Sequence, residues 1–365
     1  MKHDRILLEH GGGGLLSHEL IAEVFLPLLK NPCLERLEDS AVFRVGDQLL
    51  CFTTDSYVID PIFFPGGDIG SLAVHGTVND LSVCGGKPLV MSAGFILEEG
   101  LAVHGTVNDL SVCGGKPLVM SAGFILEEGF PMEDLRRITR SMAEAAKKAG
   151  VPIVTGDTKV VARGAADGLF INTSGIGLIE YPTPLSVKSI EPGDAVIVSG
   201  TMGDHGAAVL GKRREMGVIS AIRSDSAPLN GLIGTILETS PNIHCMRDPT
   251  RGGLGAILAE IAGQSGCLIE LREKDIPVRE EVRGICEILG FDPLFLANEG
   301  KVALFCAPAD AGRVLDVMKA HEYGREAAII GAVGERGRGR LVLRTAIGGS
   351  REVDLPVGEL VPRIC

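Results

Sequence analysis

The sequence predicts an α/β protein of two domains built on mixed sheets. Three observations indicate this class: a length of 365 residues, apolar segments of strand length that alternate with helical patterns, and a restart of that alternation after residues 181–184. We therefore expect domains at residues 1–180 and 181–350, followed by a mobile tail at 351–365.

Apolar segments and their flanking residues predict the elements of the first half. Strands are expected at 49–53, near Val90 or Val119, at 151–155 and at 168–178, with a helix from about 69. The clearest helix is 131–149, which has Pro at its start, acidic residues in its first turn, two lysines in its last turn and Gly150 just beyond. The apolar stripe expected along this helix is Leu135, Ile138, Met142, Ala145 and Ala149.

The second half repeats the alternation of strands and helices. We expect strands at 195–199, 302–306 and 328–333, a loop and helix at 203–216, and a helix at 254–262. Two such halves favour a site between two α/β domains.

Composition excludes several classes of protein. The net charge of −12 disfavours a nucleic-acid or anionic-membrane partner. No apolar run reaches the roughly 18–20 residues that span a bilayer, and the charged start does not resemble a signal peptide. The nine cysteines include no Cys-x-x-Cys pair, which disfavours zinc and disulfide frameworks. We expect a cytoplasmic protein.

An exact repeat interrupts the first domain. Residues 72–100 recur letter for letter as residues 101–129, a 29-residue tandem duplication. Evolved structural repeats drift in sequence, so this identity indicates a recent duplication or a sequence error. Each copy predicts one helix, one turn and one strand, and we expect the upstream helix and the downstream strand to take the native places. Asp80 and Asp109 therefore compete for one position.

Four polar segments could carry chemistry on phosphates. They contain Asp55 after the first strand, Asp80 (repeated as Asp109) on a helix, Asp157 with Lys159 after a strand, and Asn298 with Glu299 before a strand. Each alone is typical of a turn or a helix cap, but together they could hold Mg²⁺ and phosphate groups. Gly12 and Gly13 lie in a glycine run whose backbone N–H groups could approach a phosphate.

The chain ends in a cysteine, Cys365, on a segment that contains Pro and Gly. A thiol on such a tail, beside a nucleotide site, is typical of a substrate carrier that visits its own active site. To act as a nucleophile this thiol must form a thiolate.

These segments, in this order and ending in Pro-Arg-Ile-Cys, closely resemble the HypE family of hydrogenase expression/formation proteins. That family belongs to the superfamily of aminoimidazole-ribonucleotide synthetase and selenophosphate synthetase. The resemblance covers nearly the whole chain, with the 29-residue duplication as the departure. It implies the two-domain fold of that superfamily, a homodimer and bound ATP with Mg²⁺.

The resemblance also implies a reaction and partners. A carbamoyltransferase, HypF, would load a carbamoyl group onto Cys365, and ATP would dehydrate the resulting S-carboxamide to an S-cyanate. The cyano group would pass to the iron of a [NiFe]-hydrogenase through a HypC–HypD scaffold complex. Carried over by motif, Asp55, Asp80 (or Asp109) and Asp157 would hold Mg²⁺ and ATP, with Lys159 near the phosphates. Glu299 is the candidate base that removes the carboxamide N–H protons, and Asn298 is the candidate orienting residue beside it.

Two other functions remain open from the residues. The chain could be a carrier or scaffold that only presents Cys365, a reading favoured by the disturbance of the Asp80 region by the repeat. It could also be an ATP-dependent synthetase for a small diffusible substrate. If a variant that lacks Cys365 still formed a product, that result would support the synthetase.

Overall fold

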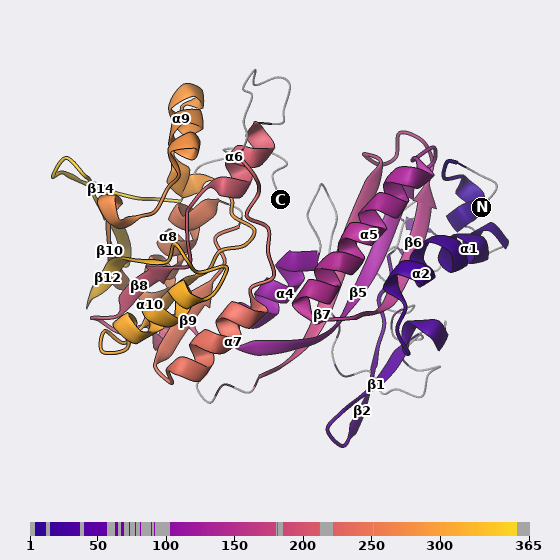
Figure 1. Ribbon diagram of the computed structural model, residues 1–365, viewed down its shortest axis with the longest axis horizontal. Coiled ribbons are helices and arrows are strands. Elements are labelled where there is room, and N and C mark those ends of the chain that lie inside the picture. Colours follow the sequence, from indigo (N-terminus) through magenta and orange to yellow (C-terminus); the bar gives the residue numbers. More distant parts are fainter. Residues whose placement is uncertain are drawn as a thin grey trace. The chain divides into compact units, whose positions relative to one another are not determined.

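The computed structural model describes residues 4–11, 15–36, 40–56, 63–64, 67–68, 103–179, 181, 185–211, 222–250 and 252–355, with residues 73, 77, 81, 89 and 91 placed singly. The chain divides into two compact units (Figure 1). The first comprises Met1–Thr106 and Leu118–Ile176, and the second comprises Val107–Pro117 and Gly177–Cys365. Within the described residues, no helix has the length and apolar character needed to cross a membrane.

A three-stranded sheet of order β6-β5-β7 forms the centre of the first unit. Its strands are β5 (Gly115–Glu127), β6 (Ile153–Val161) and β7 (Leu169–Ile179), and β5 runs parallel to β6. The hairpin β1 (Ala41–Val45) and β2 (Gln48–Phe52) packs on one face through a cluster that includes Ala41, Val119 and Val154. Two-residue strands β3 (Phe63–Phe64) and β4 (Gly67–Asp68) pair with each other.

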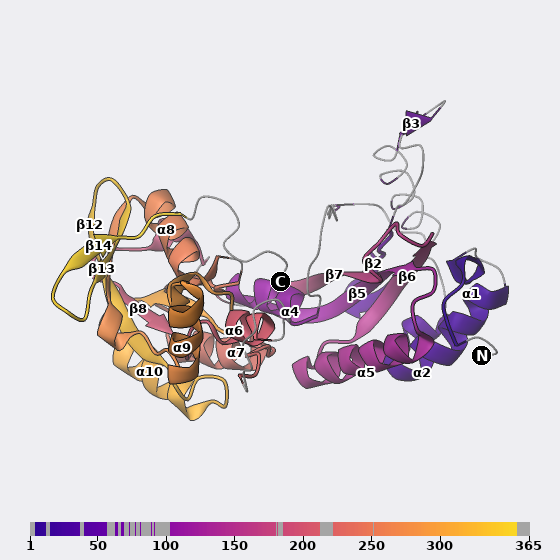
Figure 2. The ribbon, with the colours of Figure 1, turned by 90° about the horizontal axis from the view of Figure 1, so that it is seen from above.

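Helices cover the other face of this sheet, as Figure 2 shows. They are α1 (Leu15–Leu20), a π-helical segment (Ile21–Phe25), α2 (Leu26–Leu29) and α5 (Met132–Ala149). Short 3₁₀ helices also occur in this unit at Leu8–Gly11 and Leu34–Arg36. The ring centroids of Phe25 and Phe124 lie 4.8 Å apart and join the helical layer to β5.

Helix α5 confirms the clearest sequence prediction with one shift of phase. Pro131 precedes its first turn, and Gly150 ends it in the left-handed conformation at φ 70°. Leu135, Met142 and Ala149 are buried as expected. Ile138 and Ala145 are only partly buried, because the helix instead turns Thr139 and Ala146 inward. The Thr139 hydroxyl donates a hydrogen bond of 2.8 Å to the Leu135 carbonyl, which satisfies this buried polar group.

A seven-stranded mixed sheet of order β14-β13-β10-β12-β8-β11-β9 forms the second unit. Among the described strand pairs of this sheet, β10–β13 is parallel and the others are antiparallel. The strands are β8 (Ala195–Val198), β9 (Ile243–Arg247), β10 (Cys267–Arg272), β11 (Ala303–Cys306), β12 (Ala328–Arg336), β13 (Arg340–Arg344) and β14 (Ser350–Glu352).

Alternate side chains of the central strands pack into two cores, one on each face of this sheet. Val196 and Phe305 pack with α8 (Gly253–Ser265) on one face, while Ile197 and Leu304 pack with α7 (Asn230–Thr239) and α10 (Ala311–Ala320) on the other. The remaining helices are α4 (Val103–Val112), α6 (Asp204–Leu210), α9 (Glu280–Leu289) and 3₁₀ segments at Val187–Ser189, Glu273–Asp275 and Pro293–Phe295.

The downstream copy of the repeat supplies both elements of the described helix–turn–strand unit. Helix α4 leads through a turn at Gly114 directly into β5. The expected downstream strand is therefore confirmed. The helix next to it is also downstream, because a short connection keeps α4 and β5 together. The expected upstream helix, at about 72–83, lies outside the described residues apart from single positions.

Candidate active site

Three of the predicted residues come together in the first unit. The Asp157 carboxylate on β6 accepts hydrogen bonds from the Ser56 backbone N–H at 2.7 Å and from the Thr158 N–H at 2.8 Å. Lys159 Nζ donates to the same carboxylate at 3.0 Å. Because Asp55 adjoins Ser56, the segment that carries Asp55 lies against β6. The three predicted groups therefore form one local cluster.

This cluster offers two carboxylates and one cation to a ligand. The Lys159 side chain is 38% exposed, so its ammonium remains accessible while paired with Asp157. Among the residues that the structure describes, no group of three or more His, Cys, Asp or Glu side chains is arranged to hold a metal. Asp55 and Asp157 fit the one or two carboxylates through which Mg²⁺ is held when phosphates and waters supply its other oxygens.

Glu299 lies buried in the second unit among other acidic groups. Its backbone N–H donates a hydrogen bond of 3.1 Å to Asp225 Oδ1. Burial, together with the negative charges of Asp225, Asp248 and Asp109, raises the pKa of Glu299 to about 7. A carboxyl with such a pKa can exchange a proton near neutral pH, as a general base must.

A lysine next to Glu299 neutralises part of this acidic group. Lys301 Nζ lies 3.2 Å from Asp225 Oδ2 and 4.0 Å from Asp204 Oδ2, and its side chain is 12% exposed. Arg279 Nε also pairs with Asp204 at 3.3 Å. Between Glu299 and Lys301, a Cβ on Gly300 would meet the Asp225 carbonyl oxygen at 1.9 Å. Only glycine allows the backbone of this segment to approach Asp225 so closely.

Asn108 of α4 links two segments around Glu299. Its amide Nδ2 donates to the carbonyl oxygens of Ala227 (3.1 Å) and Glu299 (3.3 Å). Its Oδ1 accepts from the Leu229 N–H at 2.8 Å. The side chain is buried, so these bonds replace those it would make with water. Asn108 therefore fixes α4 to the segment that carries Glu299.

Asn298 is a second buried amide with its hydrogen bonds inside the protein. Its Oδ1 accepts from the Gly203 N–H at 2.7 Å, and its Nδ2 donates to the Pro249 and Leu296 carbonyls, both at 3.1 Å. The predicted orienting residue thus connects three backbone segments. Both polar atoms of its side chain are therefore bonded to the backbone.

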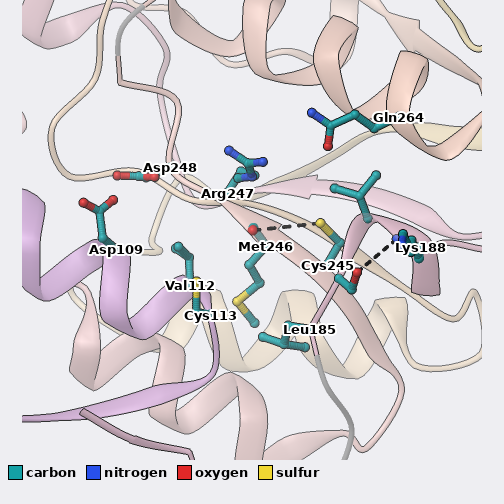
Figure 3. A pocket seen from close by; sticks show the side chains of 12 residues that line it. Asp109, Val112, Cys113, Leu185, Lys188, Cys245, Met246, Arg247, Asp248 and Gln264 are labelled. Carbon is teal, nitrogen blue, oxygen red and sulfur yellow. Dashed lines mark hydrogen bonds between the residues drawn. The ribbon is translucent and has the colours of Figure 1, made fainter. Parts of the chain in front are cut away.

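A cavity of about 700 Å³ opens beside this acidic group (Figure 3). Asp109, Asp248 and Arg247 lie near one another in its lining, and Lys188 lies farther away. Burial raises the pKa of Asp248 to about 6, with a further contribution from Asp109. Desolvation also raises the pKa of Asp109, although the residue as a whole is exposed, while Arg247 opposes that rise. The cavity lining therefore brings two carboxyls with raised pKa values together with Arg247, which partly offsets their charge.

The structure thus describes six of the predicted site residues: Asp55, Asp157 and Lys159 in the first unit, and Asp109, Asn298 and Glu299 in the second. Gly12, Gly13, Asp80 and Cys365 lie outside the described residues. Sequence reasoning missed Asp225 and Asp248 as parts of the site. It also missed Asn108 and Lys301, although both lie within two residues of predicted site residues in the sequence.

Comparison with known proteins defines the class to which this fold and site belong. The model of the AIR synthase related protein, C-terminal domain, matches residues 191–344. The corresponding N-terminal domain model matches twice, at residues 37–101 and 100–179, so each match contains one copy of the repeat. The chain thus has both domains of an AIR synthase-related protein.

Full-length relatives give the particular family. Carbamoyl dehydratase HypE of Azotobacter vinelandii is 46% identical over 365 residues, which cover all of this chain and 98% of that protein. The crystal structure of hydrogenase maturation protein HypE in complex with ATP is 44% identical, covers 98% of this chain and 99% of its own, and superposes with a TM-score of 0.80. The crystal structure of a HypE–HypF complex is 45% identical, covers 92% of this chain and 99% of its own, and has a TM-score of 0.67. The chain belongs to the HypE family of carbamoyl dehydratases, which act in hydrogenase maturation.

Proposed function

We propose that this carbamoyl dehydratase uses ATP to convert an S-carboxamide on its own Cys365 into an S-cyanate, the source of the cyanide ligands of a [NiFe]-hydrogenase. The observation that carries the proposal is a terminal cysteine on a chain that matches carbamoyl dehydratases over its full length. The relative that binds ATP supports the nucleotide.

The chemistry requires activation of an oxygen and removal of two protons. In the group S–C(=O)–NH₂ the oxygen is a poor leaving group, so it first takes the γ-phosphoryl group of ATP, releasing ADP, while nitrogen loses one proton. Loss of the second N–H proton then expels inorganic phosphate and leaves S–C≡N. The carboxamide oxygen therefore ends in phosphate, and the sulfur stays bound to carbon throughout.

Glu299 is the group that receives the N–H protons in this proposal. Its pKa of about 7 lets it accept a proton at neutral pH and release it afterwards. Asn298 orients the site through the backbone segments to which it is bonded. Asp248, whose pKa is raised to about 6, is the most similar described carboxyl, but it is less buried than Glu299.

The remaining residues would bind the nucleotide. Asp55, Asp157 and either Asp80 or Asp109 would hold Mg²⁺, which offsets phosphate charge when bound. Lys159 would neutralise charge that develops on the transferred phosphoryl group. Gly12 and Gly13 would present backbone N–H groups to the phosphates.

The proposal also includes partners. A HypF carbamoyltransferase would load Cys365, and a HypC–HypD complex would receive the cyano group. The HypE–HypF complex of relatives supports the first of these. The active form would be a homodimer. The duplication favours a second candidate, a carrier that accepts the carbamoyl group but cannot dehydrate it.

Intact mass spectrometry tests the proposal and separates it from the carrier. Wild-type protein that HypF has loaded from carbamoyl phosphate should gain about 43 Da, and it should lose about 18 Da when it is then incubated with ATP. Cys365→Ala should keep its fold and gain no mass. A gain that never falls would favour the carrier, and a gain on Cys365→Ala would exclude the terminal thiol as the acceptor.

A further inference from the structure

We propose that Asp225 and Lys301 are positioning residues that make Glu299 the proton-exchanging carboxyl of the site. In this arrangement Asp225 fixes the backbone of Glu299, and Lys301 stabilises the negative charge on Asp225. The inference rests on the proposed role of Glu299 as the base, and it names the groups that control that base.

The geometry binds Asp225 to both sides of the segment that carries the base. Asp225 Oδ1 accepts from the Glu299 N–H at 3.1 Å, and Asp225 Oδ2 lies 3.2 Å from Lys301 Nζ. The Asp225 side chain is 3% exposed, so neither contact is strongly screened by water. One carboxylate therefore joins a backbone donor and a cation that lie two residues apart.

Close backbone packing and Asn108 keep this arrangement in place. A Cβ on Gly300 would lie 1.9 Å from the Asp225 carbonyl oxygen and 2.9 Å from the Ala227 nitrogen. Asn108 bonds to the carbonyls of both Ala227 and Glu299. The two segments consequently cannot separate without breaking these contacts.

The charges around Glu299 determine which carboxyl holds the proton. Asp225, Asp248 and Asp109 face Glu299 with negative charge, and Lys301 is the cation bound to Asp225. Asp204, the other carboxylate near Lys301, has Arg279 as a partner of its own at 3.3 Å. The charge of Lys301 therefore stabilises chiefly the carboxylate of Asp225. When two neighbouring carboxyls compete for a proton, the one with its own cation stays ionised and the other takes the proton.

This division of roles predicts opposite responses from two different substitutions. Asp225→Asn removes the like charge beside Glu299, so its proton should leave at a lower pH. Lys301→Met removes the cation from this group of carboxyls, so the proton of Glu299 should leave at a higher pH. Lys301→Arg keeps the positive charge and should behave as wild type. Asp204→Asn is the matched control, since it removes a carboxylate beside Lys301 that makes no bond to Glu299.

Carboxyl-carbon NMR of protein labelled with ¹³C-glutamate measures the titration midpoint of Glu299 directly and does not require catalysis. The Glu299 resonance is identified by its loss in Glu299→Gln. We expect its titration midpoint to fall by about one pH unit in Asp225→Asn, to rise in Lys301→Met, and to stay near the wild-type value in Lys301→Arg and Asp204→Asn. An unchanged midpoint in the first two variants, or an equal shift in Asp204→Asn, would overturn the proposal.

The pH dependence of dehydration provides the second readout. The pH at which the rate reaches half of its maximum should move down with the NMR midpoint in Asp225→Asn, and a residue with only a structural role would lower the rate without that shift. If wild type fails to dehydrate but the NMR shifts occur, the proposed function fails and this inference stands. If wild type is active and neither midpoint moves, the inference fails and the function stands.

Discussion

Asn108 and Asn79 occupy the same position in the two copies of the repeat. Replacing each in turn shows which copy supplies the helix of the second unit, because only the residue that makes the buried hydrogen bonds should matter for stability. Asn108→Ala removes two donors and one acceptor and leaves the Leu229 N–H and two carbonyls without their partner. A buried polar group that loses its partner costs about 1–3 kcal/mol, and we take about 2–4 kcal/mol for the site as a whole. Asn79→Ala should change local stability by less than about 0.5 kcal/mol.

Hydrogen–deuterium exchange read by mass spectrometry on the peptide that contains Ala227 and Leu229 is the suitable assay. It reports local opening, whereas global unfolding of a two-unit protein is not two-state. A loss of 2 kcal/mol corresponds to exchange that is faster by roughly 30-fold. Equal effects of Asn79→Ala and Asn108→Ala would refute the reasoning, because they would mean that either copy can fill the place of α4.

Three further predictions follow from the site. Gly300→Ala should destabilise the second unit by about 3 kcal/mol or more in calorimetry, since its Cβ would meet the Asp225 carbonyl at 1.9 Å. The free energy of unfolding should fall as pH rises from about 4.5 to about 7, because the folded state raises the pKa of Glu299 and so holds its proton more strongly; Glu299→Gln should reduce this dependence in pH-dependent denaturation. Lys159→Met should slow dehydration by about 100-fold or more in a mass-spectrometric time course while carbamoyl loading continues.

The elements best predicted from the sequence were those whose signals are local. Helix α5 carries a proline start, charged ends and a glycine stop, so its position follows from a few neighbouring residues. Its buried face was less certain, because Thr139 is polar by type yet is accommodated by a bond to the preceding turn. Strands β8 and β11 were equally clear, since their apolar residues form short uninterrupted runs.

The parts of the site that the sequence did not reveal depend on contacts between distant residues. Glu299 was identified within its motif, but Asp225, its partner, lies 74 residues earlier in an unremarkable polar segment. The repeat limits prediction from sequence in a different way. Two identical segments have the same propensities, so only the tertiary contacts of Asn108 assign the downstream copy to the described place.

The most direct test of the account is the fate of a carbamoyl group loaded on protein that carries Glu299→Gln. The glutamine keeps the size of the side chain but cannot accept a proton. The account predicts that intact mass rises by about 43 Da on loading and stays there when ATP is added, while wild type loses about 18 Da. A loss of about 18 Da from Glu299→Gln at the wild-type rate would contradict the assignment of Glu299 as the base.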